Sequence, residues 1–588
     1  MNKTEKIICL LLGAALAWYI FTEIPKQKKA AEAAAAESAR IAATASATNA
    51  PPAANVPVTL PMPPPPEAKP VVTEMSNWVK PDVPEKTLTL ENDQLKLELS
   101  SWGAVVKKAT LKQYAHRLGA VSEENPPVVL DFTDAPVGAL EGVPGLAPNA
   151  AYEVRSVESN AVVFVNAAVT RKVVLGANYQ VSYEETFRTV PTTGSTLSLG
   201  LMQMGVSKND LLSIDSFVEG PKGGEAVHHA DEEPLKDYLV GGLSGGCSGS
   251  KSAAGLPAKM DVPCHGSQKW IAVKNRFFVT ALASSTEAND GFIATVARDV
   301  RSANYRPESV AAKVTFPKGE ATRTSVFYVG PKKQSLLWDL GMRDVMDFGM
   351  WRWICYPLVW ILNVFNDWIP NYGVAIILLT ILVRILFWPL THKSTVGMKK
   401  MQEIQPLMKE IQKKYKDNPQ RLQQETLALY RDHKVNPMSS CLPMLIQIPV
   451  FIALFNVLRS AVELRYAPFL WIADLSEPEG LFASWFPFGG LNILPILMAA
   501  TMALQSALTP STGDKNQQRM MMVFMPVMML VMFYSFPSAL SLYWTLSQVF
   551  SIVQMWLIRR KSAAKTEVLT PEVIGPPETR QMRRHGKA

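Results

Sequence analysis

The 588-residue sequence has little of the chemistry on which metal centres and disulfide scaffolds depend. It contains five cysteines and seven histidines, with no CxxC pair and no HExxH motif. Only 19% of the residues are charged, whereas 48% are hydrophobic. These shortages exclude a disulfide-dense scaffold and the CxxC class of redox and zinc motifs. We therefore expect neither a metal nor a cofactor.

Acidic residues are missing from the long apolar runs near the C-terminus, and these runs indicate the class of protein. Five runs lie at 373–390, 442–458, 491–508, 520–536 and 539–558, and most are close to the length that a bilayer requires. None contains Asp or Glu, which argues against a carboxylate proton relay within them. The pattern predicts a multi-domain membrane protein with an α-helical core over residues 371–560.

The N-terminal segment, residues 1–25, contains a further apolar run at 7–24 behind Lys3 and Lys6. No good small-residue cleavage site ends this run, so we expect an uncleaved signal anchor, with a cleaved signal peptide as the alternative. Residues 26–77 are rich in Ala and Pro. Such a composition buries too little apolar area to offset the entropy of ordering, which predicts a disordered linker.

Residues 78–335 contain short β-favouring runs separated by turn residues, a pattern that predicts an all-β sandwich. Sixteen residues separate Cys247 from Cys264, and we expect the two to form a disulfide because the topology below places them in an oxidising compartment. The flexible linker before this domain leads us to expect that it is separable from the membrane core.

Charge between the apolar runs predicts the topology. The loop 392–436 carries ten Lys and Arg against five Asp and Glu, whereas the loop 459–490 has an excess of acidic residues. By the positive-inside rule the N-terminus, the loop 392–436 and the basic tail 561–588 lie in the cytoplasm, and residues 78–335 lie outside as a periplasmic domain. Parity then gives six spans, so the aromatic segment 336–370 is predicted to be an interfacial amphipathic helix on the periplasmic face.

The basic loop 392–436 has its own apolar pattern. Met401, Ile404 and Met408 follow three-four spacing, and Pro419 suits the start of a second helix. We expect an antiparallel helical hairpin. Its positive charge suits anionic lipid headgroups or ribosomal RNA, with a solvated topology signal as the simpler alternative.

Arg384 is the one charged residue inside the 373–390 run. Arginine in hydrocarbon is costly, so it should face a wet cavity or a polar partner, unless it snorkels to the inner leaflet. Thr380 precedes it by four residues and shares its helix face. The other runs offer neutral polar residues: Gln447, Gln505, Ser541, Tyr543, Ser547 and Gln548. Together they suggest a hydrated cationic cavity, with ordinary interhelical hydrogen bonding as the alternative.

Several motifs resemble those of the YidC/Oxa/Alb family of membrane protein insertases, in order and in spacing. In the membrane core they are ILVR at 381–384, WPLT at 388–391, VNP at 435–437, CLPMLIQIPVF at 441–451, VELRYAPF at 462–469, FMP at 524–526 and FPSAL at 536–540. In the soluble region LEND at 90–93, WIAV at 270–273 and FYVGP at 327–331 resemble the Gram-negative type with a large periplasmic domain.

This resemblance implies an insertase and chaperone of the bacterial inner membrane, which is not an enzyme, with a hydrophilic groove. The groove arginine would be Arg384, and the family's aromatic pair would be Tyr543 and Trp544. We expect the groove to be lined by Arg384, Thr380, Gln447, Gln505, Tyr543, Trp544, Ser547 and Gln548. Substrate spans would slide past Ile446, Pro449, Phe451 and Phe524.

The resemblance also implies partners: nascent membrane proteins, the Sec translocon, and the ribosome and signal-recognition machinery through the hairpin and the tail. Anionic lipids are a further expected partner of these basic segments. A secondary transporter is the main alternative function, but it would require inverted repeats and intramembrane acids, and neither is visible. An anchored carbohydrate-active enzyme is a third, because sandwich folds can carry sugar chemistry.

Overall fold

The computed structural model gives two compact units, and each is described by itself. The described residues are 81–119, 121–191, 194–203, 212–218, 224–229, 235, 258–298, 307–433, 435, 442–482, 490–508 and 520–566. One unit contains residues 382–445, and the other contains the β-rich region (residues 87–331) with most of the helices. The predicted signal anchor and linker lie outside the described residues.

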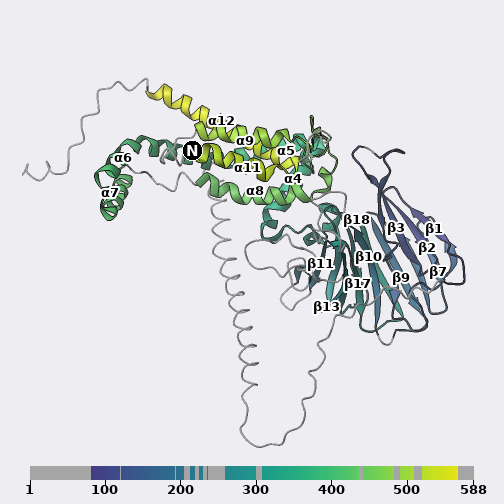
Figure 1. Ribbon diagram of the computed structural model, residues 1–588. Helices are drawn as coiled ribbons and strands as arrows, with labels where there is room; N and C mark the ends of the chain where they lie inside the picture. Colours follow the sequence, from purple (N-terminus) through teal and green to yellow (C-terminus); the bar gives the residue numbers. More distant parts are fainter. Residues whose placement is uncertain are drawn as a thin grey trace, which may run out of the picture. The chain divides into compact units, whose positions relative to one another are not determined.

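The described residues of the β-rich region form three antiparallel sheets. Figure 1 shows these strands and labels several of them. The first has the order β1 (Thr87–Glu91), β2 (Leu95–Ser100), β3 (Val105–Ala115), β4 (Pro127–Asp131). The second runs β13 (Lys259–His265), β16 (Gly291–Arg298), β17 (Pro307–Phe316), β10 (Ser195–Gln203), β5 (Leu140–Glu141). The third runs β12 (Glu225–His228), β11 (Ser213–Val218), β14 (Gln268–Lys274), β15 (Phe278–Ser285), β18 (Thr322–Pro331), β9 (Gln180–Phe187), β8 (Val169–Leu175), β7 (Ala161–Val165), β6 (Glu153–Val157).

Alternation of buried and exposed residues makes these sheets two-faced. Every second residue of β8 is buried, and β9 follows the same period, as expected for strands with one face against a core. Strand β10 contacts β14 and β15, and strand β17 contacts β11 and β14, so the five-stranded and nine-stranded sheets pack face to face. The prediction of a β-rich domain is confirmed.

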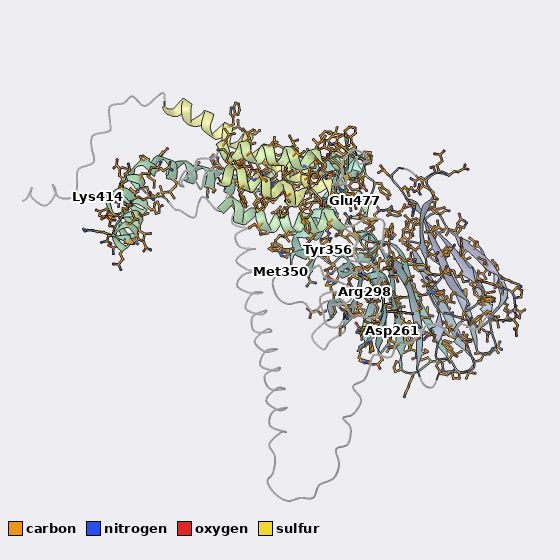
Figure 2. All side chains as sticks on the ribbon, viewed as in Figure 1. Asp261, Arg298, Met350, Tyr356, Lys414 and Glu477 are labelled. Atoms are coloured by element: carbon orange, nitrogen blue, oxygen red, sulfur yellow. The ribbon has the colours of Figure 1, made fainter. Side chains whose placement is uncertain are left out.

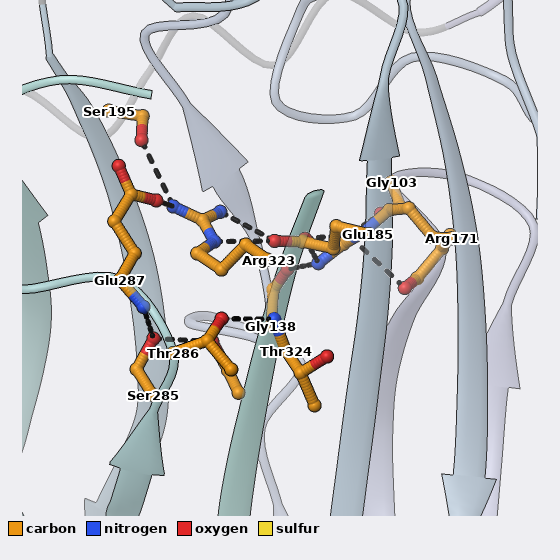
Figure 3. Close-up of polar contacts among 12 residues, drawn as sticks. Gly103, Gly138, Arg171, Glu185, Ser195, Ser285, Thr286, Glu287, Arg323 and Thr324 are labelled. Carbon is orange, nitrogen blue, oxygen red and sulfur yellow. Dashed lines mark hydrogen bonds and ion pairs between the residues drawn. The ribbon is translucent and has the colours of Figure 1, made fainter. Parts of the chain in front are cut away.

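A charged network is buried at the centre of this region (Figure 3). Glu185 lies opposite Arg171 on β8 and opposite Arg323 on β18, and all three side chains are 0% exposed. The Nη2 atoms of the two arginines lie 2.8 and 2.6 Å from its carboxylate oxygens. Arg171 also donates to the carbonyls of Gly103 and Gly138, at 2.6 Å each. The network therefore ties the nine-stranded sheet to two loops outside it.

Removal of the shared carboxylate should destabilise the region strongly. In Glu185→Gln the buried Arg171 loses its carboxylate partner and Arg323 keeps the more distant carboxylate of Glu287, at 3.4 Å, so the free energy of unfolding should fall by about 3–5 kcal/mol. The neighbouring Glu184→Gln is the matched control, because its ion pair with Lys172 is half exposed, and its effect should be about 0–1 kcal/mol. Amide hydrogen exchange of β8, β9 and β18 in the full chain measures both, and equal effects would contradict the assignment.

The helices follow the strands along the chain. After α3 (Gln334–Asp339) and the 3-10 turns η1 (Arg343–Met346) and η2 (Gly349–Trp351) come α4 (Arg352–Trp368), α5 (Tyr372–Glu403), α6 (Gln405–Lys414), α7 (Pro419–Asp432), α8 (Leu442–Ser460), η4 (Val462–Leu464), α9 (Ile493–Leu508), the π-turn η5 (Met520–Phe524), α11 (Met525–Phe533) and α12 (Ser538–Thr566). Helix α9 contacts both α11 and α12.

Helix α4 is amphipathic, as the segment 336–370 led us to expect. Its buried face carries Cys355, Leu358, Val359 and Leu362. The Cys355 thiol lies 3.6 Å from the carbonyl of Ala453 on α8, which places the two helices in contact. Its exposed face presents Trp353, Trp360 and Trp368.

Among the described residues one helical stretch, Tyr372–Gly397, is both long enough and apolar enough to cross a membrane. Shorter apolar stretches are Gln447–Ser460, Ile493–Leu508 and Met522–Phe533. Helix α5 does not end with its apolar run at 390 but continues to Glu403, with Pro389 inside it. Proline removes a single donor there, and the following polar residues are compatible with a helix. The count of six spans stays a prediction.

The unit that contains residues 382–445 holds the end of α5, α6 and α7. Met401, Ile404 and Val435 form a small buried cluster, against which Met408, Leu429 and Tyr430 pack. The Asn418 side chain accepts a hydrogen bond from the Arg421 amide at 3.1 Å and so caps α7, with Pro419 at its first position. Helices α6 and α7 contact each other. The residues with three-four spacing lie on both sides of the junction between α5 and α6, and the antiparallel hairpin stays a prediction.

Candidate functional site

Helix α5 carries the two residues expected on its groove face. Thr380 is fully buried, and its hydroxyl donates to the Ile376 carbonyl at 2.7 Å, within its own helix. Arg384 lies one turn further on and is half-buried. The nearby Leu382, Ile385 and Leu386 are exposed apolar side chains.

Helices α8 and α12 meet through a polar contact. The Gln447 amide donates to the Tyr543 hydroxyl at 2.9 Å, and Tyr543 is only 1% exposed. Tyr543 is buried and Gln447 is half-buried, and the hydrogen bond between these two polar side chains stabilises the contact of two apolar helices. The structure thus brings together two of the predicted groove residues from separate runs of sequence.

An aromatic cluster lies beside this pair. The Trp544 ring meets Phe451 edge to face, with centroids 4.7 Å apart, and lies 5.5 Å from Phe533 on α11. The Trp544 indole nitrogen is buried without a hydrogen-bond partner among the described residues. Sequence reasoning missed Phe533, although its spacing from Phe536 in an apolar run was a weak signal of a packed pair.

Helix α12 buries several small polar side chains. Ser541, Thr545 and Ser547 are all buried, and the Thr545 hydroxyl donates to the Ser541 carbonyl at 2.8 Å. Gln554 is buried further along the same helix. Thr545 and Gln554 were not among the predicted residues, although their spacing from Ser541 and Ser547 could have indicated them. Gln548 and Gln505, the latter on α9, are half-buried.

The predicted substrate path is only partly described. Pro449 lies half-buried within α8, and Phe451 is shared with the aromatic cluster. Phe524 is 57% exposed beside Val523 and Val527, which are also exposed. The side chain of Ile446 lies outside the described residues. Cys247 also lies outside them, so the disulfide between Cys247 and Cys264 on β13 stays a prediction.

These features define a class: a membrane protein with an apolar helical core, buried polar groups between its helices, and a large β-rich domain. Comparison with known proteins identifies the family. Residues 364–565 match the model described as "60Kd inner membrane protein", and residues 249–361 match "YidC periplasmic domain".

Two membrane protein insertases named YidC illustrate the likeness. That of Chlorobaculum parvum is 31% identical over 503 residues, which cover 80% of this chain and 81% of the relative. That of Syntrophobacter fumaroxidans is 42% identical over 311 residues, which cover 52% of this chain and 56% of the relative, so this match spans about half the length of each. A solved "Active YidC insertase" is 18% identical, covering 81% of this chain and 93% of that one, with a TM-score of 0.33.

The chain belongs to the YidC family of membrane protein insertases. The family resemblance predicted from the motifs is confirmed, with an inner-membrane protein and a periplasmic domain.

The hydrogen bond between α8 and α12 can be tested by a double-mutant cycle. Gln447→Leu and Tyr543→Phe should each destabilise the protein, and their coupling energy should be about 0.6–2 kcal/mol because each loses the same partner. The free energy of unfolding of the full chain in micelles measures this. Strictly additive losses would show that the pair does not interact.

Proposed function

We propose that this chain inserts nascent membrane proteins through a hydrophilic groove lined by α5, α8, α9 and α12. The observation that carries the proposal is the hydrogen bond between the half-buried Gln447 and the buried Tyr543, one turn before the buried Ser547 on α12. Polar groups cluster between apolar runs that contain no acid, which suits a hydrated lining of neutral polar side chains.

Arg384 supplies the groove's positive charge in this proposal. The five apolar runs themselves contain no Asp or Glu. A fixed cation in a wet cavity attracts the acidic tail of an incoming segment and shortens the low-dielectric distance that the tail must cross. The apolar part of the segment then enters lipid, which contributes about 25 cal/mol per Å² removed from water. No covalent step is required.

The proposed topology has six spans, with the N-terminus, the hairpin and the tail in the cytoplasm. Helix α4 lies in the outer interface, which its exposed tryptophans suit. Residues Pro449, Phe451 and Phe524, with Ile446, form the path along which a substrate span slides, and the exposure of Phe524 supports its place on that path.

The partners proposed are nascent membrane proteins, the Sec translocon, and the ribosome with the signal-recognition machinery. The hairpin supports the ribosome proposal, because Lys409, Lys413 and Lys416 are all exposed on or next to α6. Anionic lipid headgroups would be attracted by the same charges.

Charge at Arg384 should decide which tails are inserted. Arg384→Lys should keep most insertion activity, and Arg384→Ala should reduce insertion of acidic tails. Arg384→Glu should reduce insertion of acidic tails the most, by about tenfold, which corresponds to ~1.4 kcal/mol. The measurement is insertion of one substrate with acidic, neutral or basic tails at matched protein level. A structural role for the guanidinium fork would instead make Lys fail as badly as Ala.

Arg155→Glu is the control, because it makes the same change of charge at an exposed position on β6. Its effect should be negligible for all three tails. Equal loss across all tails in the Arg384 variants would contradict the electrostatic role.

The hairpin proposal predicts a salt-dependent contact. Replacing Lys409, Lys413 and Lys416 by Gln should reduce the slope of log affinity against log salt for ribosomes by about two to three. The control replaces the exposed Gln412, Gln420 and Gln424 by Ala, which changes no charge. If anionic vesicles lose binding and ribosomes do not, the hairpin is a lipid-binding element instead.

A further inference from the structure

Arg276 lies in the turn between β14 and β15, where an arginine is ordinarily solvated. The Asn275 side chain accepts from the amides of Phe277 and Phe278, at 3.0 and 2.8 Å, and so shapes this turn. Arg276 is nevertheless only 5% exposed. A charged side chain this deeply buried on a turn indicates dedicated partners.

Those partners belong to the helical core. The Arg276 Nε donates to the carbonyl of Arg459 at 2.7 Å, and Nη2 donates to the carbonyl of Ser476 at 2.6 Å. Its Nη1 lies 2.5 Å from the Glu477 carboxylate. Arg459 is the penultimate residue of α8, so its carbonyl is among those without a partner inside the helix. A cation there also complements the negative end of the helix dipole.

The same segment, residues 475–477, holds the start of α12. The Ser538 amide and hydroxyl both donate to the Glu477 carbonyl, at 2.9 and 2.6 Å. The Ala539 amide donates to the Leu475 carbonyl at 2.9 Å. Glu477 is labelled in Figure 2, at the end of the helices that is nearest the strands. One guanidinium group therefore joins the end of α8 to the start of α12.

A second arginine makes the reverse contact. Arg465, which follows η4, donates to the carbonyl of Ala115 on β3 at 2.8 Å. Its guanidinium group also stacks on the ring of Tyr466, 4.2 Å from the centroid. The β-rich region and the helical core thus each insert an arginine into the other.

We propose that Arg276 is a positioning residue, which holds the outer ends of α8 and α12 together and so keeps the groove closed on the periplasmic side. We call the contacts of Arg276 with Arg459, Ser476 and Glu477 the clasp. Helix α8 carries Gln447 and helix α12 carries Tyr543, so the clasp acts on the two helices whose polar pair is proposed to line the groove. A lysine cannot replace it fully, because its ammonium lacks the planar fork that reaches three acceptors. This inference runs against the expectation that the β-rich domain is fully separable.

The test measures access from outside to Ser541→Cys, a position that is 0% exposed in the first turn of α12. A membrane-impermeant maleimide is added to right-side-out spheroplasts that express the full chain. Labelling of this peptide is followed by mass spectrometry, which leaves the native cysteines in place. Arg276→Ala should raise its labelling rate about tenfold or more, because a lost charged hydrogen bond shifts an opening equilibrium by that factor.

Graded variants and controls keep the result interpretable. Arg276→Lys should be intermediate, and Glu477→Gln should raise labelling less than Arg276→Ala, because it removes the carboxylate partner but leaves both backbone carbonyl contacts. Lys269→Ala, exposed on β14, should leave labelling unchanged. Insertion should fall in the same order as labelling rises, and for all three tail charges.

Two outcomes would overturn the proposal. One is a loss of insertion with unchanged labelling at position 541. The other is an equal rise of labelling at Thr280→Cys, which is fully buried on β15, because that would show general unfolding of the β-rich region. Although the proposal rests on the groove, the labelling needs no substrate, so failure of the clasp is distinguishable from failure of the insertase proposal.

Discussion

The constraint on which this structure depends is the cost of burying polar groups away from water. Glu185 is buried between two arginines, and each arginine finds further acceptors beyond it. Arg276 is buried against two backbone carbonyls and a carboxylate. Gln447 and Tyr543 satisfy each other between apolar helices. Each contact joins elements far apart in sequence, because a buried polar group accepts only a partner that meets its geometry.

Helix ends extend the same constraint to the junction of the two parts of the larger unit. The last carbonyls of α8 and the first amides of α12 lack intrahelical partners. Arg276 satisfies one end, and the segment 475–477 satisfies the other. Arg276 contacts both the end of α8 and the segment 475–477, and this segment accepts hydrogen bonds from the start of α12. The two helices therefore cannot separate at this end without breaking several of these hydrogen bonds. The β-rich domain thereby contributes to the geometry of the helical core.

Much of the architecture could be predicted from the sequence. The fold places strands at the β-favouring runs and helices at the apolar runs. It also packs together Met401, Ile404 and Met408, which their three-four spacing placed on one side. The end of α5 could not be predicted, because the run of apolar residues stops at 390 while the helical backbone continues to Glu403. An apolar run indicates which part of a helix is surrounded by apolar groups, but it does not show where the helical backbone ends.

The site was predictable in proportion to how unusual each residue is in its surroundings. Arg384, Gln447 and Tyr543 stand out in apolar runs, so the sequence alone indicated them. Thr545 and Gln554 are less conspicuous in the sequence, and only their burial on α12 makes them candidates for the site. Arg276 carried no signal at all, because an arginine on a β-turn is ordinarily solvated, and its partners lie about two hundred residues away.

The two arginines illustrate opposite uses of the same side chain. Arg276 has its charge matched by Glu477 and its fork occupied by carbonyls, so it contributes geometry rather than field. Arg384 lies in an apolar run, and its proposed role in the groove depends on its positive charge. A clasp needs a guanidinium group, whereas a groove cation needs only a positive charge. Tolerance of lysine therefore separates the two roles: it should be high at Arg384 and only partial at Arg276.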